Sequence, residues 1–320
     1  MSRTRVWIYP VVVAVLGTGA VCGQGYPGRP IRFLTTGIGG STDLAARTVA
    51  QGLTDSVGWN VVVDNRGSTI VASDMVSKAL PDGYTILVTT DGHWRGPLVQ
   101  KMPFDPVKDF APITLVSRSP NILVVHPALP VTSVKGLIAL AKARPGELNY
   151  GAGAIGASTH LASELFKVMA GVDIVHVPYK SSGGAVTPLL SGQLQVMFGT
   201  TGTVATHIKS GRLRALAVST AQPSALAPGL PTIAAAGNLP GYESAATAAI
   251  FAPAGISPTI IKRLHEEISR VLVRPDVKER FFNQGVEIVG GSPLETAAFV
   301  KSDMETTARI IKETGMRVER

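Results

Sequence analysis

The sequence reads Thr36-Gly37-Ile38-Gly39-Gly40-Ser41-Thr42-Asp43 between an apolar run at residues 31–34 and a segment with helical periodicity that begins at Leu44. This order predicts a buried strand, a glycine turn and a helix that opens on hydroxyl side chains. The first turn of a helix has unpaired N–H groups and the positive end of the dipole, so it favours an anion. Because glycine has no Cβ, its backbone amides can approach such an anion closely. We therefore predict that residues 36–43 bind an anionic ligand.

A second glycine-rich turn follows the same plan. It reads Gly151-Ala152-Gly153-Ala154-Ile155-Gly156-Ala157 and leads into Ser158-Thr159-His160-Leu161-Ala162. This helix start shares four of five residues with Ser41-Thr42-Asp43-Leu44-Ala45. Either turn alone is weak evidence, since ordinary strand-to-helix connections also carry hydroxyl caps. The pair favours two anion-binding turns on two lobes, and we predict that Gly153, Ala154, Ile155, Gly156, Ala157, Ser158 and Thr159 form the second one.

Strand and helix patterns alternate through the first part of the chain. Strands are expected at residues 31–34, 61–63 and 84–88, with helices at 42–56 and near 70–80. The continuous β-branched run at 61–63 suggests a parallel strand that is buried on both faces. Such an alternation is typical of a doubly wound sheet, which binds ligands at the carboxyl ends of its strands. Thr90 and Asp91 lie at such an end, and we add them to the candidate site.

The chain then crosses to a second lobe. Two strands are expected at 113–116 and 122–125, split by Ser119-Pro120 and too close together for a helix between them. Further strands at 174–177, 194–198 and 213–218 alternate with helices, and the ends of two of them place Tyr179, Gly199 and Thr200 in the candidate site. A strand at 245–251 and helices at 258–273, 276–284 and 293–315 return to the first lobe. We predict an α/β fold with lobe 1 at residues 26–121 and 246–320 and lobe 2 inserted at 122–245, each lobe a doubly wound, mainly parallel sheet flanked by helices.

Composition excludes several classes of protein. Of the 320 residues 45% are hydrophobic and 16% charged, which is not the composition of a disordered chain. The net charge of +8 is spread without a Lys/Arg run, and aromatic residues make up 6%, so a nucleic-acid partner is not expected. The basic excess instead suggests mild steering of anionic ligands.

The N-terminus has the layout of a signal peptide. A basic segment, residues 1–5, precedes an apolar segment, 6–21, that is short and contains Pro10, and small residues follow at Gly23 and Gly25. We predict that residues 1–25 are removed on export to the periplasm, with cleavage between Cys22 and Tyr26. Lipidation of Cys22, the only cysteine, is the alternative. The mature chain then has no thiol for disulfides, metal or catalysis.

Catalytic motifs are missing from the sequence. His160 and Glu164 could share a metal ion, but a local pair on one helix is the simpler interpretation. Asp43 could act as a general base, although a helix first turn already explains an acidic residue. Lys180 beside Ser181-Ser182 could form a Ser/Lys pair, yet loop residues of this kind serve binding equally well. We expect no enzyme, no metal and no cofactor.

The chain also resembles a known family, the solute-binding proteins of tripartite tricarboxylate transporters, called Bug receptors. The matching motifs run in order from residue 26 to the C-terminus, and they include Asp64-Asn65-Arg66, Pro81-Asp82-Gly83-Tyr84-Thr85, His176-Val177-Pro178-Tyr179-Lys180 and Leu213-Arg214-Ala215-Leu216-Ala217-Val218. The resemblance implies a two-lobed periplasmic binding protein of the Venus flytrap type (type II). It also implies that the two glycine turns hold the carboxylates of a small ligand, which is delivered to membrane permease subunits. We expect a monomer.

One departure from the family bears on the ligand. The family usually has an Asp where this chain has Gly199. Losing that carboxylate would weaken a site for a ligand ammonium, which suggests an organic acid rather than an amino acid. Two alternatives stay open: a protein that presents its ligand to a membrane sensor kinase, and a secreted hydrolase, for which no motif is found.

Overall fold

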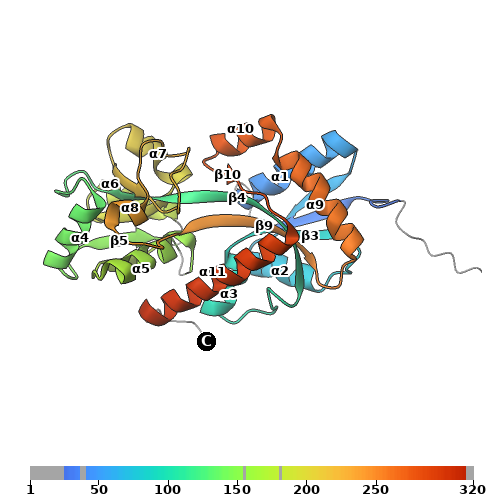
Figure 1. Cartoon of the computed structure of the whole chain (residues 1–320), viewed down its shortest axis with the longest axis horizontal. Coiled ribbons are helices and arrows are strands. Elements are labelled where there is room, and N and C mark those ends of the chain that lie inside the picture. The colour runs from blue at the N-terminus through green and yellow to red at the C-terminus, as the bar shows by residue number, and fades with distance from the viewer. Residues whose placement is uncertain (1–24, 37–40, 154–155, 180–181, 315–320) are drawn as a thin grey trace, which may run out of the picture.

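The computed structural model describes residues 25–36, 41–153, 156–179 and 182–314, apart from the side chains of Ser41 and Thr314. It is an elongated molecule of two α/β lobes, joined by the long strands β4 and β9 (Figure 1). Lobe 1 contains β1 (Ile31–Thr35), α1 (Ser41–Val57), β2 (Val61–Asn65), α2 (Thr69–Ser77), β3 (Thr85–Thr90), α3 (Gly92–Val99), β9 (Ala245–Pro253), α9 (Pro258–Leu272), α10 (Pro275–Asn283), β10 (Glu287–Ile288) and α11 (Pro293–Thr314).

Lobe 2 repeats the alternation of strands and helices. Its elements are α4 (Val134–Ala143), β5 (Asn149–Ala152), α5 (Ser158–Ala170), β6 (Val175–Pro178), a 3-10 turn (Ser182–Ala185), α6 (Val186–Leu190), β7 (Val196–Thr200), α7 (Thr201–Lys209), β8 (Arg214–Val218) and α8 (Ile233–Gly237). The remaining strand, β4 (Phe110–Val125), contributes to both lobes.

The strands follow the order β2-β1-β3-β9-β4-β7-β5-β6, with β8 and β10 paired to β4. Pairing is parallel in the outer part of each lobe, where β1 lies between β2 and β3, and β5 lies between β6 and β7. The inner strands β9 and β4 pair antiparallel with their neighbours. The sheet is therefore mixed, and the antiparallel part connects the lobes.

The prediction of two strands at 113–116 and 122–125 was wrong, because they are parts of one strand of 16 residues, β4. Pro120 pairs with Ala245 of β9, and from Asn121 onward β4 pairs with β7 instead. Proline is accepted here because its fixed φ suits an extended chain and because it lies where the strand changes neighbours. Pro120 therefore marks a change in strand pairing within β4, and the chain does not turn there.

The expectation for residues 61–63 was also wrong in one respect. The segment is a parallel strand, but β2 forms the edge of the sheet, and Val62 is 50% exposed. A run of β-branched residues suits any pleated strand, so it indicates the strand without indicating burial on both faces.

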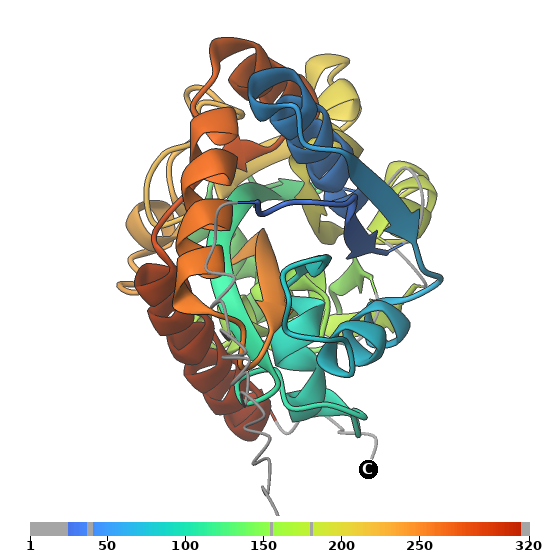
Figure 2. The same ribbon diagram turned by 90° about the vertical axis from the view of Figure 1, so that its right-hand side faces the viewer.

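Each lobe buries apolar side chains on both faces of its sheet. In lobe 1, α1 and α9 cover one face, and α2, α3 and α11 cover the other (Figure 2). The sequence of α9 explains its packing. The helix starts at Pro258 and buries Leu264, Ile268 and Val271, whose helical spacing places them on one face. Helix α11 packs on α3 in lobe 1 and on α5 in lobe 2, so that Val300 joins one core and Ile310 the other.

No helix within the described ranges is long and apolar enough to cross a membrane. The predicted signal peptide falls almost entirely on residues 1–24, which lie outside them.

Two helical glycines give a matched test of packing. A Cβ on Gly52 of α1 would lie 2.3 Å from Val271 Cγ1 of α9, whereas a Cβ on Gly202 of α7 would find ordinary contacts. We expect Gly52→Ala to lower the free energy of unfolding by about 1–2 kcal/mol, since overpacking exceeds the gain of about 1 kcal/mol in helix propensity. Gly202→Ala should be neutral or stabilising. Chemical denaturation checks both, and a stabilised Gly52→Ala would contradict the close packing of α1 on α9.

Candidate functional site

A cavity of about 330 Å³ lies between the two lobes. Lobe 1 lines it with the end of β3 and with α3, lobe 2 with the residues that precede and open α5, and Ala246 of β9 completes the wall. The lining residues are Thr90, Asp91, Gly92, Arg95, Gly96, Val99, Gln100, Gly156, Ala157, Ser158 and Ala246. Five of them, Thr90, Asp91, Gly156, Ala157 and Ser158, are among those predicted from the sequence.

Asp91 and Arg95 are the charged residues of this lining, and both take part in a buried ion-pair network. Arg95 Nη1 donates to Asp91 Oδ2 at 2.7 Å, while Nε and Nη2 each donate to Asp303 of α11 at 2.7 Å. Trp94 Nε1 also donates to Asp303. The guanidinium thus serves two carboxylates, and the network carries a net charge of −1 when both are ionised. Its cation is already engaged and is not free for an anionic ligand.

Burial raises the pKa of Asp91 above its ordinary value. Arg95 opposes this rise, because its positive charge favours the carboxylate, whereas the nearby charge of Asp303 adds to it. Asp91 therefore gains protons more readily than an exposed aspartate does.

The lobe 2 wall is the first turn of α5 with the residues before it. Ala157 is the extended N-cap residue, and Gly156 has a left-handed φ of 82°, which glycine adopts without strain. Gly156 also lies against Val99 of α3, so the two lobes touch beside the cavity. The first N–H groups of α5 have no acceptor within the helix, and Ser158 is the first residue of this helix. The wall can therefore offer donors to an anion.

The predicted first turn is described only in part. Residues 37–40, and likewise Ala154 and Ile155 of the second turn, lie outside the described ranges. At its edges, Thr36 and Thr42 share a hydroxyl hydrogen bond, and Asp43 accepts from Arg47 Nε at 2.9 Å and from Asn65 Nδ2 at 2.8 Å. These contacts tie β1, α1 and β2 together, which gives Asp43 a structural role.

The other predicted site residues lie outside the described cavity. Gly153 donates its N–H to Thr159 Oγ1 at 3.2 Å, which links the residue after β5 to the first turn of α5. The backbone of Tyr179 bonds to Ala152, and Thr200 Oγ1 shares a hydrogen bond with Thr203. A Cβ on Gly199 would point at Val204 of α7, 2.3 Å from its Cγ1. This position faces α7, and its identity therefore says little about the cavity.

Sequence reasoning missed α3, and with it Arg95, Gly96, Val99 and Gln100. Two glycines and Pro97 interrupt this segment, so its helix propensity is poor. The one local signal is the spacing of four residues between Asp91 and Arg95, which suits an ion pair on a helix.

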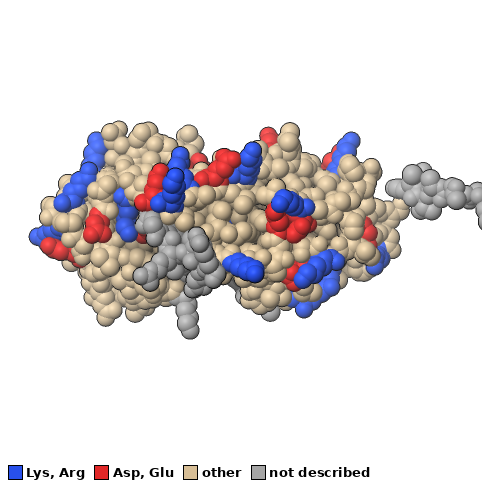
Figure 3. Space-filling model, turned by 90° about the horizontal axis from the view of Figure 1, so that it is seen from below, with Lys and Arg blue, Asp and Glu red and all other residues tan. Residues whose placement is uncertain are grey.

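Among the described residues, no cluster of His, Cys, Asp and Glu could hold a metal ion. Glu164 accepts hydrogen bonds from Tyr150 and Lys167. Charged side chains of both signs are interspersed on the face shown in Figure 3, which is unlike a basic nucleic-acid surface.

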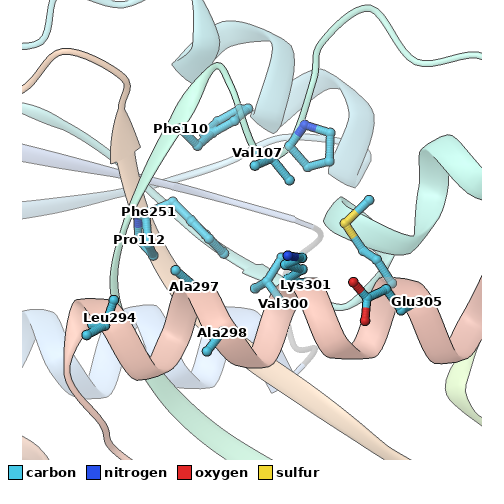
Figure 4. Close-up of a pocket in the computed structure, with 12 residues that line it drawn as sticks. Val107, Phe110, Pro112, Phe251, Leu294, Ala297, Ala298, Val300, Lys301 and Glu305 are labelled. Atoms are coloured by element: carbon cyan, nitrogen blue, oxygen red, sulfur yellow. The ribbon is translucent and has the colours of Figure 1, made fainter.

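A larger pocket of about 590 Å³ lies on lobe 1 between residues 106–112, Phe251 and α11 (Figure 4). Its lining is almost wholly apolar and includes Val107, Phe110 and Leu294, with Lys301 and Glu305 as its charged members. It lacks the several converging donors that a carboxylate needs, so the cavity between the lobes is the candidate site.

The ion-pair network makes a prediction about stability. Arg95→Met should lower the free energy of unfolding by about 3–5 kcal/mol, because it leaves the buried Asp91 and the partly buried Asp303 without their cation. Without Arg95, burial raises the pKa of Asp91 in the folded state unopposed, so part of the loss should disappear as pH falls from 8 to 5 and Asp91 becomes protonated. The exposed Lys78–Asp74 pair supplies the control, and Lys78→Met should change stability by less than about 1 kcal/mol. Equal effects in the two variants, measured by urea unfolding, would contradict this account.

Comparison with known proteins identifies the family. Residues 45–316 match the Tripartite tricarboxylate transporter family receptor. Protein BugT of Bordetella pertussis is 35% identical over the whole of both chains.

Solved structures of related proteins support the same family assignment. A structure described as R. palustris Rpa4515 with adipate is 35% identical, with a TM-score of 0.78 over 91% of this chain and 99% of that one. The periplasmic binding protein BugD is 29% identical, with a TM-score of 0.74 over 92% and 99%. The α/β fold of two lobes is confirmed by these structures. The chain therefore belongs to the tripartite tricarboxylate transporter receptor family, a family of periplasmic solute-binding proteins that are receptors and not enzymes.

Proposed function

We propose that this receptor captures a small dicarboxylate in the cavity between its lobes and delivers it to the permease subunits of a tripartite tricarboxylate-type transporter. The observation that carries the proposal is that both lobes line one cavity, with Thr90 and α3 on one side and Gly156, Ala157 and Ser158 on the other. A ligand that bridges such walls favours the closed arrangement of the lobes.

The chemistry of the walls supports an anion. The first turn of α5 offers backbone N–H groups, the Ser158 hydroxyl and the positive end of a helix of 13 residues. From its sequence alone, we assign the same role in lobe 1 to the predicted first turn, residues 36–43, of which residues 37–40 lie outside the described ranges. Each charge-assisted hydrogen bond contributes about 1.5–3 kcal/mol. Several of them, less the cost of ordering ligand and lobes, give about −8 kcal/mol, a micromolar dissociation constant.

The ligand class rests on the related receptor that holds adipate. Because the Arg95 guanidinium is engaged by Asp91 and Asp303, the carboxylates must be held by amides and hydroxyls rather than by a free cation. A dicarboxylate would place one carboxylate at the start of α5 and the other at the predicted first turn, residues 36–43.

Further parts of the proposal come from the sequence. We place the lobe boundaries at residues 121/122 and 245/246. The main apolar core of lobe 1 draws on residues 31–116 and 248–286, and that of lobe 2 on residues 123–242, with Ile310 of α11 as the one described member from the other side of the boundary. Residues 1–25 act as a cleavable export signal, and the exported receptor works as a monomer.

Loss of the Ser158 hydroxyl tests the lobe 2 wall. We expect Ser158→Ala to weaken binding of adipate about tenfold, near 1.4 kcal/mol, because a charge-assisted hydrogen bond is lost. Isothermal titration calorimetry measures this, and Ser41→Ala tests the first turn in the same way. Ser191→Ala, which is exposed and remote from the cavity, is the control. Unchanged affinity in both Ser158→Ala and Ser41→Ala would refute the mechanism, and wild-type protein that binds no dicarboxylate would refute the function.

Delivery needs a separate test. Deleting the gene should abolish uptake of the bound acid, and complementation should restore it. Uptake that persists, together with loss of a transcriptional response to the acid, would assign the receptor to signalling instead.

A further inference from the structure

A cluster of titratable side chains lies directly behind the lobe 2 wall of the cavity. His160 of α5 is 3% exposed, and its ring lies 4.4 Å from that of His176 in β6. His176 in turn stacks on Tyr150 of β5 at 4.8 Å. The Tyr150 hydroxyl donates to Glu164 Oε1, which also accepts from Lys167 Nζ at 2.9 Å. The His160 ring therefore packs against His176, which is held in turn by stacking on Tyr150.

The point of contact between this cluster and the cavity is Gly156. Its backbone N–H donates to His160 Nδ1 at 3.4 Å, while Gly156 itself lines the cavity. On the other side of the same turn, the Gly153 N–H donates to Thr159 Oγ1. Two side chains of the first turn of α5 thus hold the two glycines that frame the turn. Of these acceptors, the imidazole is the one that protonation can remove.

His160 can accept this hydrogen bond only when it is neutral and carries its proton on Nε2. Burial, helped by the nearby His176, lowers the pKa of His160 to about 4, while Glu164 opposes and Lys167 assists this shift. The ring is consequently neutral at pH 7, as the Gly156 contact requires.

We propose that His160 is a positioning residue for the ligand: its Nδ1 holds the Gly156 amide and so sets the shape in which Ala157 and Ser158 face the cavity. The inference rests on the proposed function, since it concerns the same wall. It also adds a consequence, because protonation of Nδ1 would remove the acceptor and release the turn.

The affinity test compares two variants at pH 7 with adipate as the probe. His160→Leu removes the acceptor and should weaken binding about five- to tenfold, the effect of one hydrogen bond. His160→Asn places an amide oxygen near the position of Nδ1, so it should bind within about threefold of wild type. Circular dichroism and thermal unfolding confirm that both variants are folded. Wild-type affinity in His160→Leu, or equal weakening in both variants, would overturn the proposal.

The pH profile separates positioning from packing. Acidification protonates the carboxylates of adipate equally for every variant, so the informative quantity is the ratio of wild-type to His160→Asn affinity. This ratio should fall as pH drops through about 4, because the histidine loses its acceptor and the asparagine does not. A constant ratio would overturn the proposal.

A further measurement needs no ligand. The NMR amide resonance of Gly156 should shift with pH in this same range in the free wild-type protein and stay in place in His160→Asn. If it does so while no dicarboxylate binds, the positioning role stands and the proposed function fails. If it does not move in wild type, the positioning role fails whatever binds.

Discussion

The antiparallel ladder between β4 and β9 joins the two lobes into one molecule. Phe110 to Pro120 of β4 pair along the whole of β9, and the last residues of β4 pair with β7 and β8 in lobe 2. Because β4 belongs to both lobes, the point after Pro120 where its pairing changes from β9 to β7 joins the two lobes. This places α3 and the start of α5 opposite each other, with Ala246 of β9 between them. The cavity follows from this continuity of the sheet.

The charges around the cavity are already paired with one another, which is unusual for the anion site that we propose. Its one guanidinium among the described lining residues, Arg95, is held by Asp91 and Asp303, and its side chain is 6% exposed. In the function that we propose, the attraction for an anion comes from amides, hydroxyls and helix dipoles, which bind without a free cation. Such contacts suit a receptor that has to release its ligand, because their sum after the costs of closure is moderate. The ion pairs instead anchor α3 to α11.

Much of the fold could be predicted from local signals. Apolar runs bounded by glycine or proline identified β1, β3 and β9, and the hydroxyls after the second glycine turn placed the start of α5. The resemblance of short motifs identified the family, which the comparisons confirm. Of the candidate site, Thr90, Asp91 and the residues before α5 were predicted because strand ends and helix starts are local features.

The rest depends on contacts between distant parts of the chain. Helix α3 forms despite Gly92, Gly96 and Pro97 because Trp94 is buried and donates to Asp303, 209 positions later. Long-range pairing likewise carries β4 through Pro120, and it makes β2 an edge strand although its residues would suit the centre of a sheet. No window of the sequence contains these partners, so propensity alone missed α3 and gave the wrong answer for β4 and for the burial of β2.

Helix α11 has a consequence for the range of motion. It is anchored by Val300 and Asp303 in lobe 1, and it places Ile310 in the apolar core of lobe 2. A rotation that spread the lobes widely would have to pull Ile310 into water, at about 1.5–3 kcal/mol for a side chain of this size. The helix therefore acts as a tether that limits the swing and shifts the resting population toward compact conformers. A receptor restrained in this way loses less conformational entropy on binding a ligand, because α11 already limits the relative motion of the lobes.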